Sequence, residues 1–411
     1  MPVLLSLGSK LSEWLSSPPV LRVVSSILRR HKPVLKIGAQ AFVARYADVT
    51  GVLSDGGERF GVTEIYAAKM ERTTGAFILG MEHTPLYQRE ASFIRAAVKP
   101  ADMARVKELV TARAADILAA AKPKGRIDVV SEYGRLLPLH VVQTYFGVRG
   151  PEQQSAYLRW LRNVFWDLFL NLGNDARVSQ AALVDSGELR DHIDVVIAEH
   201  SKALAAGNAP DDFVTRLLEL RASEYPELDD VALRRNIGGV IVGAVETQAK
   251  AMALALAELL SRPVELVEAR KAAAAGDDEL VSRYVFEALL FNPHNPLIVR
   301  RCHQDTTIGT GAQATTIARG TTVYALTLSA MFDEEVVNDP DQFRIDRPRN
   351  HYLHFGHGQH TCFGSQLNLV VLPAAIKQLL LLPNLRISDQ TPRIEYEGPF
   401  PDRLVLEFDG S

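Results

Sequence analysis

The sequence contains Phe355-Gly356-His357-Gly358-Gln359-His360-Thr361-Cys362-Phe363-Gly364 near its C-terminal end. Gly356 and Gly358 can take backbone angles that other residues avoid, so they allow a tight loop in front of a helix. Such a loop brings backbone N–H groups near the Cys362 sulfur, and these groups and the helix N-terminus favour a thiolate. Gly364 lets the backbone pass close to a flat ligand. A thiolate in this position is a strong ligand for iron.

Two other interpretations of the cysteine remain open at this point. Cys362 could be a buried structural residue at a helix start. The repeat of His351, His354, His357 and His360 beside it is also a composition found at zinc sites. A zinc site, however, would leave the glycines without a role, and it would lack a second cysteine nearby. The other cysteine of the chain, Cys302, is predicted to be a small buried or half-buried side chain.

The loop resembles the haem-binding signature of the cytochrome P-450 superfamily, Phe-Gly-x-Gly-x-His/Arg-x-Cys-x-Gly, and matches it at every fixed position. The resemblance implies haem b as cofactor, with Cys362 as the axial ligand of its iron. It also implies that Phe355 packs near the sulfur and that His360 binds a haem propionate.

A long apolar helix is predicted over Asp229 to Leu260, and its middle is apolar on every face, which indicates burial. It contains Gly243-Ala244-Val245-Glu246-Thr247, which resembles the oxygen-activating motif of the same superfamily, with Ala244 in place of the commoner glycine. The resemblance implies that Glu246 and Thr247 deliver protons. The residues alone also allow a threonine that bonds back to a carbonyl four residues earlier and a glutamate that pairs with a distant arginine.

Further segments resemble superfamily motifs in the right order, from about residue 40 to 385. Arg300 matches a propionate ligand, and arginine suits bidentate pairing with a carboxylate. Glu82-His83-Thr84 matches the start of a haem-contacting helix, so His83 is expected to reach the other propionate. Tyr87 stands where the superfamily usually has an arginine, and its hydroxyl can donate to the same carboxylate.

One hallmark departs from the superfamily pattern. In place of Glu-x-x-Arg the chain has Glu287-Ala288-Leu289-Leu290. In the superfamily this pair and an arginine matching Arg347 form a buried ion network. Removing one partner of such a network costs roughly 3–5 kcal/mol. We therefore expect either that Arg347 pairs with Glu287 alone or that Glu287 is protonated.

Composition sets the broader limits. The chain has 411 residues, 47% hydrophobic and 23% charged, with a net charge of -4 and two cysteines. These values favour a globular protein without a disulfide framework, in a reducing cytoplasm. They give no indication of nucleic-acid binding or of a transmembrane segment. Short strands are predicted over Leu297 to Val323, and Phe60 to Gly80 reads as a long loop. The predicted fold is mainly α with a minor β part, in a single domain over 1–411. The resemblance implies the cytochrome P-450 triangular prism around a buried haem.

The function implied by the resemblance is a haem-thiolate monooxygenase. It would insert one oxygen atom from O2 into a lipophilic small molecule, or couple such a molecule oxidatively. Electrons would come from NAD(P)H through a ferredoxin and a ferredoxin reductase. The alternatives are an atypical member that acts as a peroxide-driven enzyme or a haem-dependent isomerase, neither of which would need the acid–alcohol pair, and a non-catalytic haem- or ligand-binding protein, which Leu290 motivates. The substrate pocket is predicted to include Phe77, Phe165, Val242, Gly243, Leu297 and Ile298.

Overall fold

The computed structural model describes residues 18–171 and 173–410. These residues form two compact units, and neither unit is one continuous stretch of sequence. The first unit comprises residues up to 65 together with 286–362. The second comprises 66–285 together with the residues from 363 onward. The single domain expected from the sequence stays a prediction.

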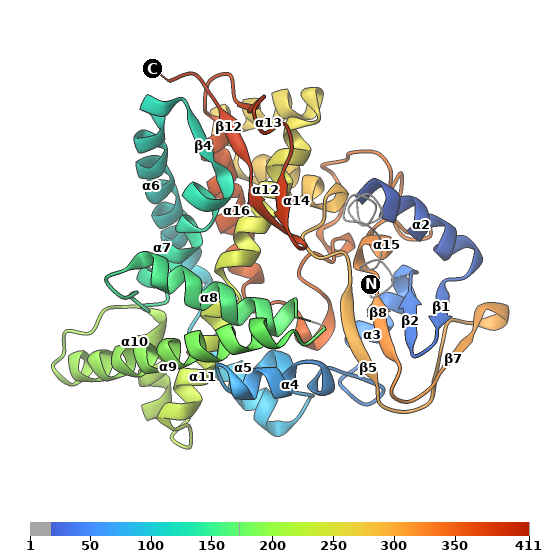
Figure 1. Cartoon of the computed structure of the whole chain (residues 1–411), viewed down its shortest axis with the longest axis horizontal. Coiled ribbons are helices and arrows are strands. Elements are labelled where there is room, and N and C mark those ends of the chain that lie inside the picture. Colours follow the sequence, from blue (N-terminus) through green and yellow to red (C-terminus); the bar gives the residue numbers. More distant parts are fainter. Residues whose placement is uncertain (1–17, 172, 411) are drawn as a thin grey trace. The chain divides into compact units, whose positions relative to one another are not determined.

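The first unit is built on a mixed sheet (Figure 1). Its elements are α2 (Pro18–His31), β1 (Val34–Ile37), β2 (Gln40–Val43), α3 (Tyr46–Ser54), β3 (Phe60–Gly61), β5 (Ile298–Cys302), β6 (Thr306–Ile308), β7 (Thr315–Ile317), β8 (Thr322–Ala325) and α15 (Thr327–Met331). The sheet has the order β1-β2-β8-β5-β3. β2 and β8 pair in parallel, and the other neighbours are antiparallel. β6 and β7 form a separate antiparallel pair.

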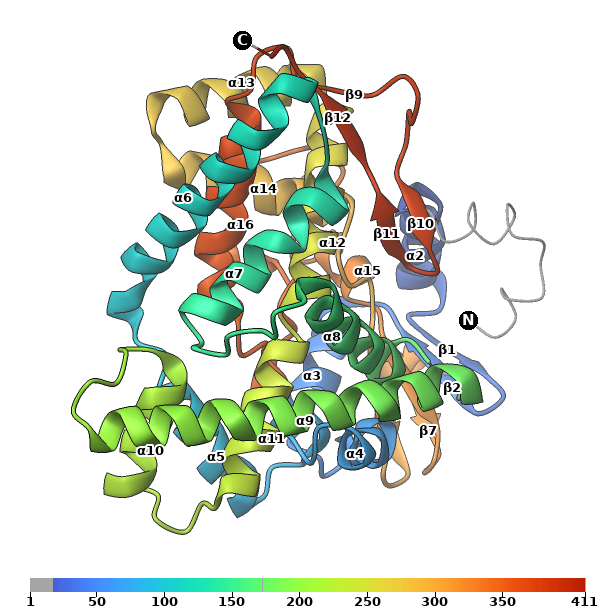
Figure 2. The same cartoon turned by 60° about the vertical axis from the view of Figure 1, so that its left-hand side comes forward.

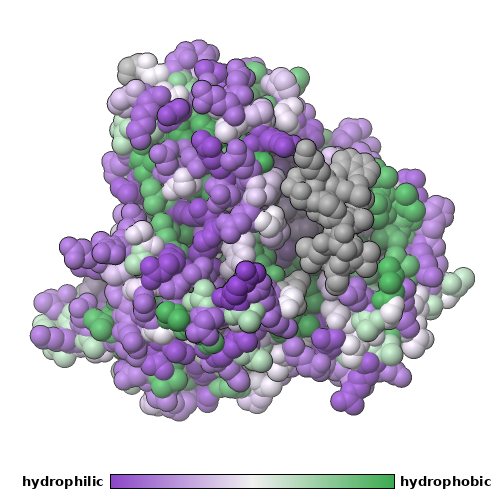
Figure 3. All heavy atoms as spheres, viewed as in Figure 1, coloured by the Kyte–Doolittle hydropathy of each residue, from purple (hydrophilic) through white to green (hydrophobic). Residues whose placement is uncertain are grey.

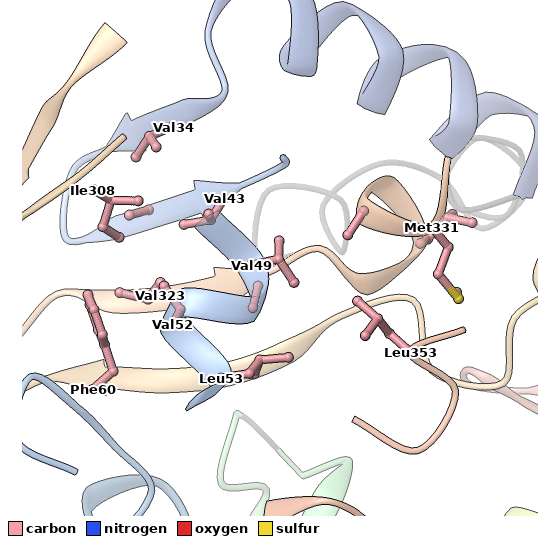
Figure 4. Close-up of a cluster of buried hydrophobic side chains, with 14 of the residues drawn as sticks. Val34, Val43, Val49, Val52, Leu53, Phe60, Ile308, Val323, Met331 and Leu353 are labelled. Atoms are coloured by element: carbon pink, nitrogen blue, oxygen red, sulfur yellow. The ribbon is translucent and has the colours of Figure 1, made fainter. Parts of the chain in front are cut away.

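The core of the first unit lies where α3, α15 and the sheet meet (Figure 4). Val49, Val52 and Leu53 of α3 face buried side chains of β2 and β8. Leu290 and Phe291, at the end of α14 (Asp278–Phe291), belong to the same cluster. Leu290 is 0% exposed, so the position of the missing arginine is part of an apolar core.

The second unit is mostly helical. Its helices are α4 (Thr63–Arg72), which begins in the first unit, α5 (Pro85–Ala96), α6 (Met103–Ala121), α7 (Leu136–Thr144), α8 (Gln154–Phe169), α9 (Ala176–Ala205), α10 (Phe213–Ser223), α11 (Asp230–Val242), α12 (Val245–Leu260), α13 (Pro263–Ala275), the start of α14, and α16 (Ser365–Leu380). Its strands are β4 (Arg126–Asp128), β9 (Arg386–Ile387), β10 (Glu395–Glu397), β11 (Phe400–Arg403) and β12 (Val405–Glu407).

Pairwise packing organises these helices. α8 packs along α9, and α16 packs along α6 (Figures 1 and 2). α12 contacts α7, α8, α13 and α16, so it lies at the centre of the unit. β10 and β11 form an antiparallel hairpin, and β4, β12 and β9 form a small sheet (Figure 2).

Several helix ends follow directly from the sequence. Thr84 caps α5 by accepting a hydrogen bond from the Tyr87 N–H, and Pro85 occupies the first helical position. Asp229 caps α11 by accepting from the Ala232 N–H. The mainly α architecture with a minor β part is thus confirmed.

Two predictions about elements were wrong. The stretch from 60 to 80 is not simply a loop, because it contains α4, whose Ala67-Ala68-Lys69-Met70-Glu71 run consists of strong helix formers. The helix predicted over 229–260 is interrupted between α11 and α12, at Gly243 and Ala244. Glycine has a low helix propensity, and a nearby threonine hydroxyl competes for a backbone carbonyl at this point.

Two apolar segments of the chain, one mostly buried and one exposed, are of interest for possible contact with a membrane. The stretch Asp230–Leu260 is long and apolar enough to cross a membrane by length and composition, but 72% of its most apolar window is buried within the protein, as in a core helix. On α2, Val23, Val24 and Ile27 are exposed. Figure 3 shows a hydrophobic area at the right, where Figure 1 shows α2 in the same view.

Candidate active site

The loop from Phe355 to Cys362 lies in the first unit and is closed on itself. The Cys362 N–H donates to the Phe355 carbonyl at 2.9 Å. Gly356 and Gly358 have φ angles of +75° and +71°, in the left-handed region that favours glycine. Both glycines therefore have the backbone role that the sequence predicts.

The same loop packs tightly against the end of α3. A Cβ atom on Gly358 would lie 2.8 Å from the Leu53 carbonyl oxygen and from the Ser54 Cα. A side chain at this position would therefore push the loop away from α3. The loop geometry that presents Cys362 depends on glycine here.

Cys362 is half-buried, whereas Cys302 is buried, as predicted. Within residues 18–171 and 173–410, no three His, Cys, Asp or Glu side chains lie close enough together to hold a metal ion. His354, one member of the histidine repeat, donates from Nε2 to the Phe286 carbonyl oxygen at 3.0 Å. A zinc site with several protein ligands is thus not formed by the described residues. A metal bound through Cys362 would have to bring most of its other ligands with it, as a haem iron does.

Other predicted residues of the first unit lie around this loop or on β5. His360 ends a short 3₁₀ turn, Gly358–His360, and Phe355 packs its ring 5.9 Å from that of Phe286. Ile298 begins β5, and its Cδ1 would lie 3.4 Å from a Cβ on Gly356, so this predicted pocket residue lies beside the loop.

Arg300 also lies on β5, opposite Val323 of β8, and is 3% exposed. Its Nη1 donates to the Val299 carbonyl oxygen at 3.0 Å. Leu297, just before β5, is half-buried. A guanidinium buried on a strand is suited to pairing with a carboxylate.

Glu287 is fully buried near the end of α14, and three groups donate to it. Its Oε1 accepts from Arg347 Nε at 3.0 Å and from the Arg344 N–H at 2.8 Å. Its Oε2 accepts from the Tyr352 hydroxyl at 2.7 Å. Arg347 is itself held by the carbonyl oxygens of Asn338, Asp339 and Gln342 at 2.9, 2.9 and 2.6 Å.

This network corrects the expectation that Arg347 would pair with Glu287 alone. Burial raises the pKa of Glu287, and the three donors act in the opposite direction by stabilising the carboxylate. No local sequence pattern indicates Tyr352 as a partner of Glu287, because the contact between them spans 65 positions. An uncompensated Glu287, which motivated the non-catalytic alternatives, is not what the first unit contains.

In the second unit, Thr247 lies in the first turn of α12, directly after the helix break. Its hydroxyl donates to the Gly243 carbonyl oxygen at 2.6 Å, which is the back-bonding that the residues alone allowed. The Gln248 N–H spans the break to the Ala244 carbonyl at 3.3 Å. Val242, the last residue of α11, is buried, and Gly243 is half-buried. The motif therefore coincides with a local opening of the helix.

Glu246 is 3% exposed and is held by two arginines that the sequence analysis missed. Arg135, just before α7, donates to both carboxylate oxygens at 2.9 and 3.3 Å. Arg162 of α8 donates to Oε2 at 3.0 Å. Both arginines also approach exposed acids: Arg162 pairs with Glu397, and Arg135 lies 3.9 Å from Asp402. The buried carboxylate is thus connected through arginines to the surface of this unit.

His83 and Tyr87 lie together at the start of α5. Their rings meet edge to face with centroids 6.0 Å apart. His83 is exposed and its Nε2 lies 2.9 Å from Gln88 Nε2, whereas Tyr87 is buried. The structure therefore brings these two predicted residues to one helix start.

Phe77, a predicted pocket residue, lies directly over α11. A Cβ atom on Gly239 would lie 2.4 Å from Cγ and Cδ2 of the Phe77 ring. Gly239 is one helical turn before Gly243. The glycine pair Gly238-Gly239 in an apolar helix was a signal for such a close approach.

Phe165 belongs to an aromatic cluster between α8 and the β10–β11 hairpin. Its ring centroid lies 4.9 Å from that of Phe169 and 5.4 Å from that of Phe400, which also contacts Trp166 at 5.4 Å. Lys250 of α12 places its Nζ 4.3 Å from the centroid of the Phe400 ring. Burial lowers the pKa of Lys250 to about 8.

The comparison with known families decides the assignment. A family model described as Cytochrome P450 matches residues 154–406, which is more than half of the chain. The chain belongs to the cytochrome P450 family. It is accordingly an oxidoreductase of the P450 monooxygenase type.

This P450 is similar to curated P450s along most of its length. It is 24% identical over 393 residues to the pulcherriminic acid synthase of Bacillus subtilis (strain 168), covering 90% of each chain. It is 27% identical over 383 residues to the mycinamicin IV hydroxylase/epoxidase of Micromonospora griseorubida, covering 88% of each.

Solved structures confirm the P450 fold. CalO2 matches with a TM-score of 0.81 at 24% identity, over 96% of this chain and 97% of that chain. P450BioI, solved in complex with an acyl carrier protein ligated to hexadec-9Z-enoic acid, matches with a TM-score of 0.80 at 20% identity, over 95% and 98%.

Membership of the family implies haem binding, and the chemistry of the donor groups fits a haem. Cys362 is a half-buried thiol at the end of a glycine-shaped loop, which suits a single axial bond to iron. Arg300, His360, His83 and Tyr87 offer N–H and O–H donors of the kind that bind carboxylates. The roles of these individual residues stay predictions.

Proposed function

We propose that this P450 is a haem-thiolate monooxygenase that inserts one oxygen atom from O2 into a lipophilic small molecule or couples such a molecule oxidatively. Electrons would come from NAD(P)H through a ferredoxin and its reductase, in the cytoplasm. The observation that carries the proposal is the acid–alcohol pair at the helix break, where Thr247 bonds to Gly243 and Glu246 is held by two arginines.

In this proposal the Cys362 thiolate would hold the haem iron, and the haem, when bound, would supply the redox chemistry that activates oxygen. Arg300 and His360 would hold haem carboxylates, and His83 and Tyr87 would do the same. Gly364, at the N-cap of α16, would let the backbone pass close to the cofactor.

Glu246 and Thr247 would supply protons. The Thr247 hydroxyl, now bonded to the Gly243 oxygen, can rotate to donate elsewhere because a hydroxyl has one proton and a freely turning bond. The Arg135 and Arg162 contacts hold the Glu246 carboxylate in place, and their links to Glu397 and Asp402 offer a route to solvent. A peroxide-driven enzyme would not need such a pair.

A lipophilic substrate is supported by the apolar character of the predicted pocket residues. Phe77, Phe165 and Val242 are buried, and Leu297 and Ile298 are half-buried. Pockets for lipophilic ligands are lined mainly by such side chains.

Coupling of electron use to product tests the proposal. With a surrogate ferredoxin, its reductase and a substrate found by spectral-shift screening, wild-type protein should convert most of the consumed NADPH into oxygenated product. Thr247→Ala should consume NADPH but release mainly peroxide, and Thr247→Ser should keep most of the coupling. Equal coupling in Thr247→Ala and wild type would contradict the proton-delivery role. The absence of substrate-dependent NADPH consumption in wild type would contradict the monooxygenase proposal itself.

A further inference from the structure

With Leu290 in place of an arginine, the buried carboxylate of Glu287 needs hydrogen-bond donors from elsewhere in the chain. Glu287 is 0% exposed, and Leu290, one turn further along α14, is 0% exposed within the apolar cluster of the first unit. A buried carboxylate is tolerated only where hydrogen-bond donors satisfy its oxygens. The leucine can offer none.

The two carboxylate oxygens of Glu287 accept different numbers of hydrogen bonds. Oε1 accepts from both Arg347 and the Arg344 N–H. For Oε2, the donor that the described part of the chain provides is the Tyr352 hydroxyl, at 2.7 Å. Tyr352 therefore supplies a donor to the oxygen that Arg347 and the Arg344 N–H do not serve.

Tyr352 is suited to remain a donor. Burial and the neighbouring Glu287 charge both raise the pKa of Tyr352, so the hydroxyl keeps its proton under physiological conditions. Its ring stacks on that of His354, with centroids 5.1 Å apart and planes 17° apart. His354 in turn donates to the carbonyl of Phe286, the residue before Glu287.

These contacts join the end of α14 to the chain that leads into the cysteine loop. Tyr352 donates a hydrogen bond to Glu287, and His354 donates one to the Phe286 carbonyl. Phe355 is the next residue after His354. The Phe355 carbonyl accepts from the Cys362 N–H at 2.9 Å. A shift of the 352–354 segment would thus move the residue that closes the loop around Cys362.

We propose that Tyr352 is a positioning residue that takes the place of the missing arginine at Leu290. Its hydroxyl completes the donor set of Glu287, and with His354 it fixes the approach of the chain to Phe355 and Cys362. Tyr352 acts through these neighbours and is not a catalytic residue.

Haem retention tests this inference without any measurement of activity. The holoprotein would be mixed with excess apomyoglobin, and the rate of haem transfer followed by absorbance. Tyr352→Phe keeps the ring and its stacking but removes the donor. It should lose haem about tenfold faster, which corresponds to about 1.4 kcal/mol. Tyr396→Phe, at a tyrosine that is 51% exposed on β10, is the matched control and should behave as wild type.

A reciprocal substitution distinguishes replacement of the arginine from a general structural role. Leu290→Arg in the wild-type background should speed haem loss, because it adds a buried cation beside a carboxylate whose donors are complete. In the Tyr352→Phe background the same substitution should slow haem loss towards the wild-type rate. Haem retention in Tyr352→Phe equal to that in Tyr396→Phe would overturn the inference, as would equal harm from Leu290→Arg in both backgrounds.

Discussion

The contact between Phe77 and Gly239 allows a quantitative prediction about the predicted pocket. A Cβ at Gly239 would lie 2.4 Å from two atoms of the Phe77 ring, and ordinary contact begins near 3.4 Å. The ring would therefore have to move by about 1 Å. Because Phe77 is 3% exposed, its neighbours would have to move as well. Overpacking of this kind costs roughly 1–3 kcal/mol.

Gly243 provides the matched control, one helical turn away on the same apolar segment. A Cβ there would meet the Gly239 and Val240 carbonyl oxygens at 3.7 Å, which is ordinary contact. Gly239→Ala, inside α11, gains up to about 1 kcal/mol of helix propensity, and Gly243→Ala gains no more than that because Gly243 is the C-cap of α11. Because the overpacking falls on Gly239 alone, Gly239→Ala should be less stable than Gly243→Ala by up to about 3 kcal/mol, whatever the sign of each change relative to wild type.

Urea denaturation of the holoprotein, followed by tryptophan fluorescence, measures this difference. Phe77→Ala should then remove most of the penalty of Gly239→Ala, since the clash needs both partners. Equal stability of the two Gly→Ala variants, or an additive double variant, would refute the packing argument.

Two further predictions concern buried titratable side chains. Lys250→Met should stabilise the protein by roughly 1–3 kcal/mol at pH 7, because burial penalises the ammonium and the Phe400 ring offsets little of that penalty. The gain should shrink between pH 8 and 10.5, where wild-type Lys250 becomes neutral, and a pH-independent difference would argue against it. Burial lowers the pKa of His354 from 6.5 to about 4, so folding favours the neutral ring. Stability should therefore fall as pH drops from 6.5 towards 4, and His354→Gln should flatten that part of the stability profile; an unchanged slope would place the acid sensitivity elsewhere.

The sequence predicted the fold and the cysteine loop well because both depend on local patterns. Two glycines before Cys362 require a particular backbone, and their φ angles have the predicted sign. The apolar middle of 229–260 indicated burial, but the break at Gly243 depends on a competition between Thr247 and the backbone that periodicity does not record.

Partners from distant parts of the chain were not predictable in the same way. Arg135 and Arg162 lie 111 and 84 positions from Glu246, and Tyr352 lies 65 from Glu287. Each is an ordinary arginine or tyrosine in its own segment. The motif showed that Glu287 lacked its usual partner, and only the tertiary structure shows which residue supplies the donor.

The central claim is that Cys362 is the thiolate ligand of a haem iron. The most direct measurement is the absorbance difference spectrum of the dithionite-reduced protein with and without carbon monoxide, for wild type, Cys362→Ser and Cys302→Ser. Thiolate ligation predicts the strongly red-shifted Soret band in wild type and Cys302→Ser, and its loss in Cys362→Ser. A wild-type spectrum without that band, or one that survives in Cys362→Ser, would contradict the claim.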